Sequence, residues 1–151
     1  MSSLVATTPV NFQGFQLLQL SPEGDSNLPN NYGTIDLTAI KQSALSLNQL
    51  ILGFSVDRSG SMEFVSKDGK TLLQHAQCVI INIARYLMDV HKENPNTRFA
   101  IKVVYFDNTL VEIPLFKINW GQTDNLDEFI ENITNFNPRG GTNIQKPLEY
   151  F

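Results

Sequence analysis

The chain has 151 residues, of which 42% are hydrophobic and 17% are charged, and its formal net charge at pH 7 is −4. The length suits one domain with a buried core, and apolar residues are too frequent for a disordered chain. An acidic balance argues against sequence-independent binding of nucleic acid or of an anionic membrane, because both need a basic surface. We therefore expect no nucleic-acid partner and no membrane partner. The single cysteine, Cys78, excludes an internal disulfide and a zinc module with several cysteines.

The hydropathy of the chain indicates no export signal and no membrane span. Residues 1–10 contain no basic segment followed by a sustained apolar run, which is the pattern of a signal peptide. No run of about 18 apolar residues occurs anywhere in the sequence. We therefore expect a cytoplasmic protein.

The first third of the chain predicts a β-rich N-terminal extension. A turn-dense segment, residues 21–33, separates two short stretches of alternating polarity, Asn11–Leu20 and Tyr32–Ala39. We expect both stretches to form strands. No residue pattern in this third of the chain points to a chemical function.

The stronger signals begin at Leu50. Leu50–Asp57 is an apolar run that ends in a carboxylate, as is typical of a parallel strand covered on both faces. Residues 70–92 then place apolar side chains along one stripe of a long helix, which ends before Pro95. Arg98–Phe106 predicts a second buried strand, so the segment has the strand, helix, strand order of an α/β unit.

The remaining residues continue the α/β pattern. Thr109–Pro114 predicts an antiparallel edge strand, and a linker containing Trp120 leads to a short helix near Asn125–Thr134. A loop over residues 135–142 precedes the start of another helix. We therefore predict an α/β fold for residues 50–151.

Three polar residues are predicted to lie outside any site. Asp107 belongs to the tight turn before the edge strand, and we place it on the far side from the loop that follows the first buried strand. His75 and His91 lie on the long helix about 160° apart around its axis, so they cannot form a metal pair. We expect both histidines to be solvated residues of a helix face.

Candidate ligands gather directly after the first buried strand, in the string DRSGSM at residues 57–62. Asp57, Ser59 and Ser61 can converge on one point, because Gly60 lets the backbone turn sharply. Open α/β sheets place their ligand sites at this carboxyl end of a parallel strand. The glycine-rich string RGGTN at residues 139–143 offers a further hydroxyl, Thr142. Carboxylate and hydroxyl oxygens are hard ligands, suited to Mg²⁺ or Mn²⁺.

These two segments resemble the metal-ion-dependent adhesion site of the von Willebrand factor A-type (VWA) domain. DRSGSM after an apolar strand is similar to the family's D-x-S-x-S motif, and GGTN about 80 residues later is similar to the loop with its metal-binding threonine. The order of the elements between the two motifs also matches. We therefore divide the chain into a β-rich extension, residues 1–49, and the N-terminal portion of a VWA-like domain, residues 50–151.

The resemblance implies a doubly wound, mostly parallel sheet flanked by helices (VWA/Rossmann-like) and incomplete at its C-terminus. It implies that Ser59 and Ser61 bind Mg²⁺ or Mn²⁺ directly, while Asp57 acts through hydrogen bonds or bound water and Thr142 completes the set from the second loop. Neutral hydroxyls with one carboxylate leave a divalent cation under-neutralised, so an acidic side chain of a protein partner is the natural further ligand. The implied function is an adhesion-type protein–protein interaction.

The sequence also admits a metal-free alternative and argues against an enzyme. The family has a further site aspartate after the next parallel strand, and this chain ends about nine residues after Thr142. A metal-free VWA-like scaffold or truncated remnant, belonging to a larger ubiquitin-pathway-type protein and acting by packing alone, is therefore the alternative. An uncompleted sheet would also leave one side of Leu50–Asp57 unpaired, so we expect the chain to aggregate, to self-associate or to need a partner segment. A well-behaved monomer would instead indicate that the N-terminal third closes the sheet. An enzyme is not expected, because no G-x-S-x-G or S-x-x-K string marks a catalytic serine.

Overall fold

A computed structural model describes residues 10–12, 15–17 and 37–151 of the chain. The chain divides into two compact units, Met1–Gln42 and Ser43–Phe151. The helix α1, Leu37–Leu47, begins in the first unit and ends in the second. None of the helices among the described residues is long and apolar enough to cross a membrane.

The described part of the first unit differs in two ways from the predicted strands. Strands β1, Val10–Phe12, and β2, Phe15–Leu17, pair in antiparallel fashion, so two short strands, the first beginning one residue earlier than predicted, replace the single strand predicted over Asn11–Leu20. The prediction of a strand over Leu37–Ala39 is wrong, because these residues open α1. The run 37–47 contains no Gly or Pro, and its Leu and Ile residues recur three residues apart at its start. Residues 13–14, 18–20 and 32–36 of the two predicted strands lie outside the described residues.

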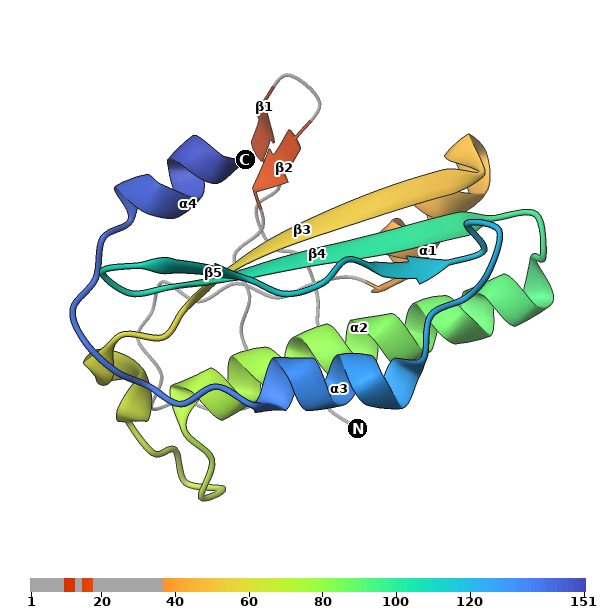
Figure 1. The fold of residues 1–151 in the computed structure, drawn as a ribbon. Coiled ribbons are helices and arrows are strands. Elements are labelled where there is room, and N and C mark those ends of the chain that lie inside the picture. The colour runs from red at the N-terminus through yellow and green to blue at the C-terminus, as the bar shows by residue number, and fades with distance from the viewer. Residues whose placement is uncertain (1–9, 13–14, 18–36) are drawn as a thin grey trace. The chain divides into compact units, whose positions relative to one another are not determined.

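The second unit is built on a mixed four-stranded sheet (Figure 1). Strand β3, Gln49–Asp57, runs parallel to β4, Arg98–Phe106, over its whole length. Strands β5, Leu110–Glu112, and β6, Phe116–Ile118, both pair in antiparallel fashion with the other side of β4. The strands β3, β4 and β5 confirm the predicted strands, and β4 is buried as predicted. The prediction that β3 is covered on both faces is wrong, because only Val56 of this strand is buried. Strand β6 replaces part of the expected linker.

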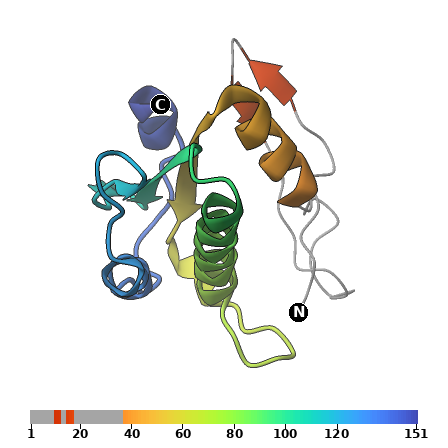
Figure 2. The same cartoon turned by 90° about the vertical axis from the view of Figure 1, so that its right-hand side faces the viewer.

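Helices lie on both faces of this sheet. Helix α2, Leu72–Glu93, and α3, Leu126–Thr134, run along one face, and the short α4, Gln145–Tyr150, lies on the other (Figures 1 and 2). The 3-10 turn η1, Gly60–Glu63, follows β3. The fold is therefore a mixed α/β arrangement with one parallel strand pair.

The long helix begins two residues later than predicted because of its N-terminal cap. The Thr71 hydroxyl accepts a hydrogen bond from Gln74 N at 3.1 Å, and Thr71 N donates to Gln74 Oε1 at 2.9 Å. These reciprocal bonds satisfy two amides at the helix start and fix Thr71 as the residue before the first turn. Asn125 caps α3 in a related way, by accepting from the amides of Asp127 and Glu128.

The core lies between the sheet and the helices α2 and α3. Alternate residues of β4 point toward these helices, and the Tyr105 hydroxyl donates to Ile133 O of α3 at 2.8 Å. Phe116 of β6 stacks on Phe129 of α3, with ring centroids 4.6 Å apart. The fully buried large side chains on this side of the sheet and on the helices are Leu73, Ile80, Ile83, Leu87, Phe99, Ile101, Val103, Tyr105, Phe116, Ile118 and Ile133.

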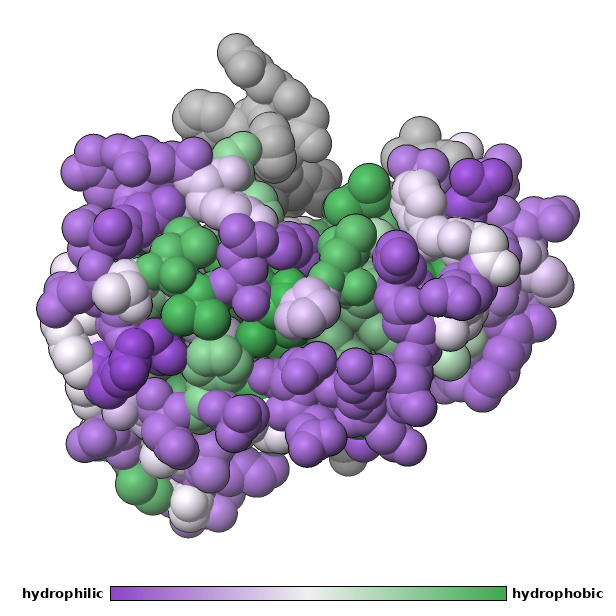
Figure 3. Space-filling model, in the orientation of Figure 1, coloured by the Kyte–Doolittle hydropathy of each residue, from purple (hydrophilic) through white to green (hydrophobic). Residues whose placement is uncertain are grey.

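The two edges of the sheet are protected to different degrees. At the outer edge Pro114 interrupts the run between β5 and β6, and Lys117 lies on β6, two features that discourage the addition of a strand. Figure 3 views this edge, where hydrophobic surface lies between the mostly hydrophilic outer surfaces of α4 and α3. Strand β3 pairs with β4 alone among the described residues. Its residues 49–56 carry no charge, and Ile51 is 58% exposed.

We predict that the protein self-associates through the β3 edge and that Ile51→Lys suppresses this association. The ammonium group would have to be desolvated when a second strand pairs with β3. Sedimentation velocity over a range of concentrations measures the effect, with Phe64→Lys as the control. Phe64 is 57% exposed, almost as much as Ile51, but it lies outside the sheet. A wild-type protein that stays monomeric, or an equal response of the two variants, would contradict the prediction.

Candidate functional site

The structure brings Asp57, Ser59 and Ser61 together at the carboxyl end of β3, as the sequence predicts. Ser59 N donates to Asp57 Oδ1 at 2.7 Å, which folds the chain back on itself at the end of the strand. The hydroxyl oxygens of Ser59 and Ser61 lie 3.0 Å apart. Ser59 is buried and Ser61 is exposed, so the hydroxyl pair can be reached from the side of Ser61.

The spacing of the two hydroxyls fits a small hard cation. Two neighbouring ligands of an octahedral Mg²⁺, at bond lengths of about 2.1 Å, are about 3.0 Å apart. The same 3.0 Å separation also suits a direct hydrogen bond between the two hydroxyls. In the part of the chain that the structure describes, no three His, Cys, Asp or Glu side chains gather to hold a metal ion. A cation at this place would therefore depend on hydroxyl ligands.

The loop at residues 138–143, named here the glycine loop, docks against the serine loop, residues 57–61. Gly60 N donates to Gly140 O at 3.0 Å, and Arg139 N donates to Arg58 O at 2.7 Å. Thr142 lies in the glycine loop and is exposed. Its hydroxyl makes no hydrogen bond with the serine loop in the described structure, so the two loops meet through their backbones.

Close approach of the glycine loop depends on its two glycines. Gly140 has a φ of +70°, which residues with a side chain rarely adopt. A Cβ on Gly141 would lie 3.0 Å from Asn108 Oδ1, closer than an ordinary contact. The glycines therefore let the loop lie directly on the turn that follows β4.

Asp107 lies between the two loops, which corrects its predicted position on the far side from the serine loop. Because β3 and β4 are parallel and in register up to the pair Asp57↔Phe106, residue 107 follows at the same end of the sheet. Asp107 is 3% exposed, and its Oδ2 lies 3.1 Å from Arg58 Nε and 3.0 Å from Arg139 Nε. It is also the turn residue that was predicted, since Oδ1 accepts from Thr109 N and from the Thr109 hydroxyl.

The Asp107 carboxylate is fully committed to these partners. Burial alone would raise the pKa of Asp107. The hydrogen bonds from Thr109 and then the two guanidinium groups outweigh burial and hold the Asp107 pKa well below its usual range. The carboxylate accepts three hydrogen bonds, from Thr109 N, the Thr109 hydroxyl and Arg139 Nε, and it faces Arg58 in an ion pair. These partners all belong to this chain, so the carboxylate is engaged within the protein and not turned toward a cation.

Arg58 is a buried cation that links the serine loop to the core. Its side chain is 6% exposed, and its Cζ lies 5.3 Å from the centre of the Phe136 ring. Phe136 in turn stacks on Tyr105 of β4 at 4.2 Å. Arg58 Nε and Nη2 are both buried and have no hydrogen-bond partner among the described residues, so the contact of Nε with Asp107 is an ion pair. Asp107 is therefore the group that compensates the charge of Arg58 in this structure.

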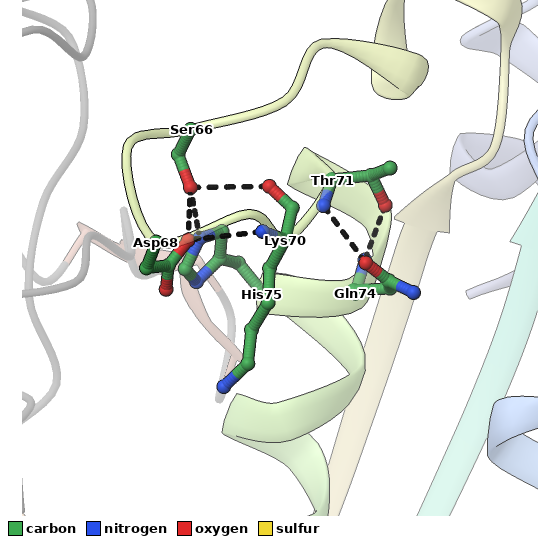
Figure 4. Close-up of polar contacts among 6 residues, drawn as sticks. All are labelled: Ser66, Asp68, Lys70, Thr71, Gln74 and His75. Atoms are coloured by element: carbon green, nitrogen blue, oxygen red, sulfur yellow. Dashed lines mark hydrogen bonds and ion pairs between the residues drawn. The ribbon is translucent and has the colours of Figure 1, made fainter.

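A second polar cluster, formed by Ser66, Asp68 and His75, lies beside the start of α2 (Figure 4). His75 is not the solvated residue that was predicted, because its Nε2 lies 2.7 Å from Ser66 Oγ and 3.2 Å from Asp68 Oδ1. Ser66 Oγ also contacts Asp68 Oδ1 and Lys70 O. The prediction for His91 is corrected as well, since its Nδ1 is buried without a hydrogen-bond partner in the described part of the chain.

The hydrogen atoms in this second cluster can be assigned from its acceptors. The Asp68 carboxylate and the Lys70 carbonyl only accept, so the Ser66 hydroxyl donates to one of them. His75 Nε2 then faces two acceptors, and the network assigns it a hydrogen. With that hydrogen, His75 Nε2 donates within the cluster.

Sequence reasoning missed the roles of Arg58, Asp107 and Arg139. Their positions in the sequence carry one usable signal, which is that Asp107 directly follows a strand predicted to lie parallel to the strand before Arg58. Parallel strands end at the same edge of a sheet, so that juxtaposition follows once the parallel pairing is accepted. The partner from the glycine loop, Arg139, has no such signal.

Comparisons with known proteins add no family to these observations. No family model, no curated protein and no solved structure matches the chain. The resemblance to the VWA domain therefore rests on the sequences of the serine loop and the glycine loop and on the order of the elements between them. A function has to be inferred from the geometry of these two loops.

We predict that Asp68 stabilises the fold in a pH-dependent way. The hydrogen bond from Ser66 is the largest cause that lowers the pKa of Asp68 from 3.8 to about 2. A carboxyl group whose pKa is lower in the folded than in the unfolded protein stabilises the fold fully at pH values above its unfolded pKa. This stabilisation is lost as the pH falls through the pKa of the folded state. The melting temperature of the wild type should therefore exceed that of Asp68→Asn at pH 4, and the gap should narrow toward pH 2. Circular dichroism melts measure both.

The control for this prediction removes the hydrogen-bond donor and keeps the carboxylate. Ser66→Ala removes the largest cause of the lowered pKa of Asp68. The difference in melting temperature between this variant and the wild type should therefore also narrow from pH 4 to pH 2. A gap between wild type and Asp68→Asn that stays constant from pH 4 to pH 2 would contradict the assignment.

Proposed function

We propose that the protein is a metal-dependent protein-interaction module. In this proposal Asp57, Ser59, Ser61 and Thr142 hold Mg²⁺ or Mn²⁺, which captures an acidic side chain of a protein partner. The observation that carries the proposal is the pair of hydroxyl oxygens 3.0 Å apart, set beside a carboxylate at the end of a parallel strand. Binding rather than catalysis is proposed, because among the described residues the hydroxyls of Ser59 and Ser61 form a hydrogen bond with each other and with no histidine.

The roles of the residues follow from their surroundings. Ser59 and Ser61 would be direct ligands, since their oxygens have the spacing of neighbouring positions in an octahedron. Asp57 already accepts from Ser59 N, so its part is to orient the serine loop and to act through bound water. One carboxylate neutralises only part of the charge of Mg²⁺. A carboxylate of the partner would balance the remainder.

The fold supports the finer proposal of a doubly wound, VWA-like sheet. The β3–α2–β4 unit pairs two parallel strands, and helices lie on both faces of the sheet (Figure 2). The unpaired side of β3 is where further parallel strands of such a fold would add. The proposed site lies outside the carboxyl end of β3, which is where doubly wound sheets bind ligands.

The alternative function is that of a metal-free scaffold. One observation favours it, which is that the hydroxyls of Ser59 and Ser61 can satisfy each other without a cation. In this case the two loops would act by packing alone, and Thr142 would be a solvated loop residue. The two functions differ in whether the protein binds a divalent cation at all.

We predict that Mg²⁺ and Mn²⁺ bind to the wild type and that Ser59→Ala weakens this binding by about tenfold or more. Removing one of few hard ligands leaves a coordination position that only water can fill. Isothermal titration calorimetry measures the affinities. Ser61→Ala should act in the same direction and is safer for the fold, because Ser61 is exposed.

The matched control is Ser46→Ala, which removes an exposed hydroxyl from α1. Its affinity for both cations should equal that of the wild type. No binding by the wild type, or equal binding by the wild type and both loop variants, would reject the metal site and leave the scaffold.

A further inference from the structure

Asp107 contacts the glycine loop at both of its ends. Its side chain accepts from Arg139 Nε at 3.0 Å, and its backbone carbonyl accepts from Asn143 N at 2.9 Å. Gly140, Gly141 and Thr142 form a short span between these two anchors. The position of the Thr142 backbone is therefore set largely by one residue of the turn after β4.

The same carboxylate also holds the serine loop. Arg58, which separates Asp57 from Ser59, lies with its Nε 3.1 Å from Asp107 Oδ2, the oxygen that receives Arg139. Two guanidinium groups repel each other, but each is attracted to the carboxylate that lies between them. The carboxylate therefore makes the net interaction of the three groups attractive. One buried oxygen thus joins two loops that are far apart in the sequence.

The contribution of each partner is distinguished by burial. Arg58 is 6% exposed and is held by Phe136 as well as by Asp107, so it belongs to the core of this end of the sheet. Arg139 is 64% exposed and lies on the glycine loop. Loss of the Arg139 side chain would free the loop without opening the core, because an exposed partner contributes little to global stability.

We propose that Asp107 is a positioning residue that holds the glycine loop, and with it Thr142, against the serine loop in the arrangement that binds the cation. The effect on cation binding rests on the proposed function. The effect on the loops does not, because it concerns contacts that exist without any ligand. Asp107 is not itself proposed as a ligand, since its oxygens accept hydrogen bonds from Thr109 and Arg139 and form an ion pair with Arg58.

The first test measures the loops without metal. Hydrogen exchange of the Gly60 and Asn143 amides reports on their bonds to Gly140 O and Asp107 O. In Arg139→Gln both amides should exchange about fivefold faster than in the wild type, while amides within β4 stay unchanged. Arg85→Gln, at an exposed arginine of α2, is the control and should change neither amide.

The second test measures Mn²⁺ affinity by calorimetry in the same proteins. Arg139→Gln should bind Mn²⁺ about fivefold more weakly than the wild type, although it removes no ligand. Asp107→Asn should weaken binding further, and Asp124→Asn controls for loss of a loop carboxylate, because Asp124 Oδ2 accepts from Lys117 N at 2.8 Å away from both loops. If Asp107→Asn fails to fold, Arg139→Gln alone decides the test.

The outcomes separate this proposal from the proposed function. Faster exchange together with weaker Mn²⁺ binding supports both. If exchange is faster in Arg139→Gln but the wild type binds no Mn²⁺, the metal site is rejected and Asp107 remains the residue that joins the loops. Unchanged exchange in Arg139→Gln, or faster exchange with unchanged Mn²⁺ affinity, overturns the positioning role.

Discussion

The parallel pairing of β3 with β4 is the constraint on which the site depends. The two strands stay in register from Gln49↔Arg98 to Asp57↔Phe106, so the residues that follow them emerge at the same place. The serine loop follows one strand and Asp107 follows the other. A shift of this register would separate Arg58 from Asp107, because successive residues of a strand point to opposite faces. Helix α2 makes the parallel pairing possible by carrying the chain back along the sheet.

A buried group of charges converts this pairing into a fixed loop arrangement. Buried ion pairs often add little net stability, because desolvation cancels much of their attraction. Removing one partner is different, and leaving Arg58 without Asp107 would cost about 3–5 kcal/mol. The arrangement therefore gives specificity to this end of the sheet, where the loops have few apolar side chains to hold them. The same donors keep the pKa of Asp107 low, so the carboxylate remains ionised and both arginines stay attached.

The sequence predicts features that depend on neighbouring residues and misses those that depend on distant ones. Strand β4 was predicted with its observed bounds because seven of its nine residues are apolar, and Asp57 meets Ser59 because one tight turn contains both. Helix α1 was missed, since a short stretch such as Tyr32–Ala39 fits a strand pattern as well as a helix pattern. The contact of Asp107 with Arg139 spans 32 positions, and nothing local marks it. The doubly wound fold stays a prediction beyond the mixed α/β arrangement.

The central claim is that a hard divalent cation binds between the serine loop and the glycine loop. The most direct measurement is the nuclear magnetic resonance spectrum of the ¹⁵N-labelled protein as Mn²⁺ is added in small amounts. Because paramagnetic broadening falls steeply with distance from the ion, the account predicts that the amide signals of Ser59, Ser61 and Thr142 disappear first, while those in the last turns of α2, near Glu93, persist. Broadening that is absent, uniform, or centred elsewhere in the chain would contradict the claim.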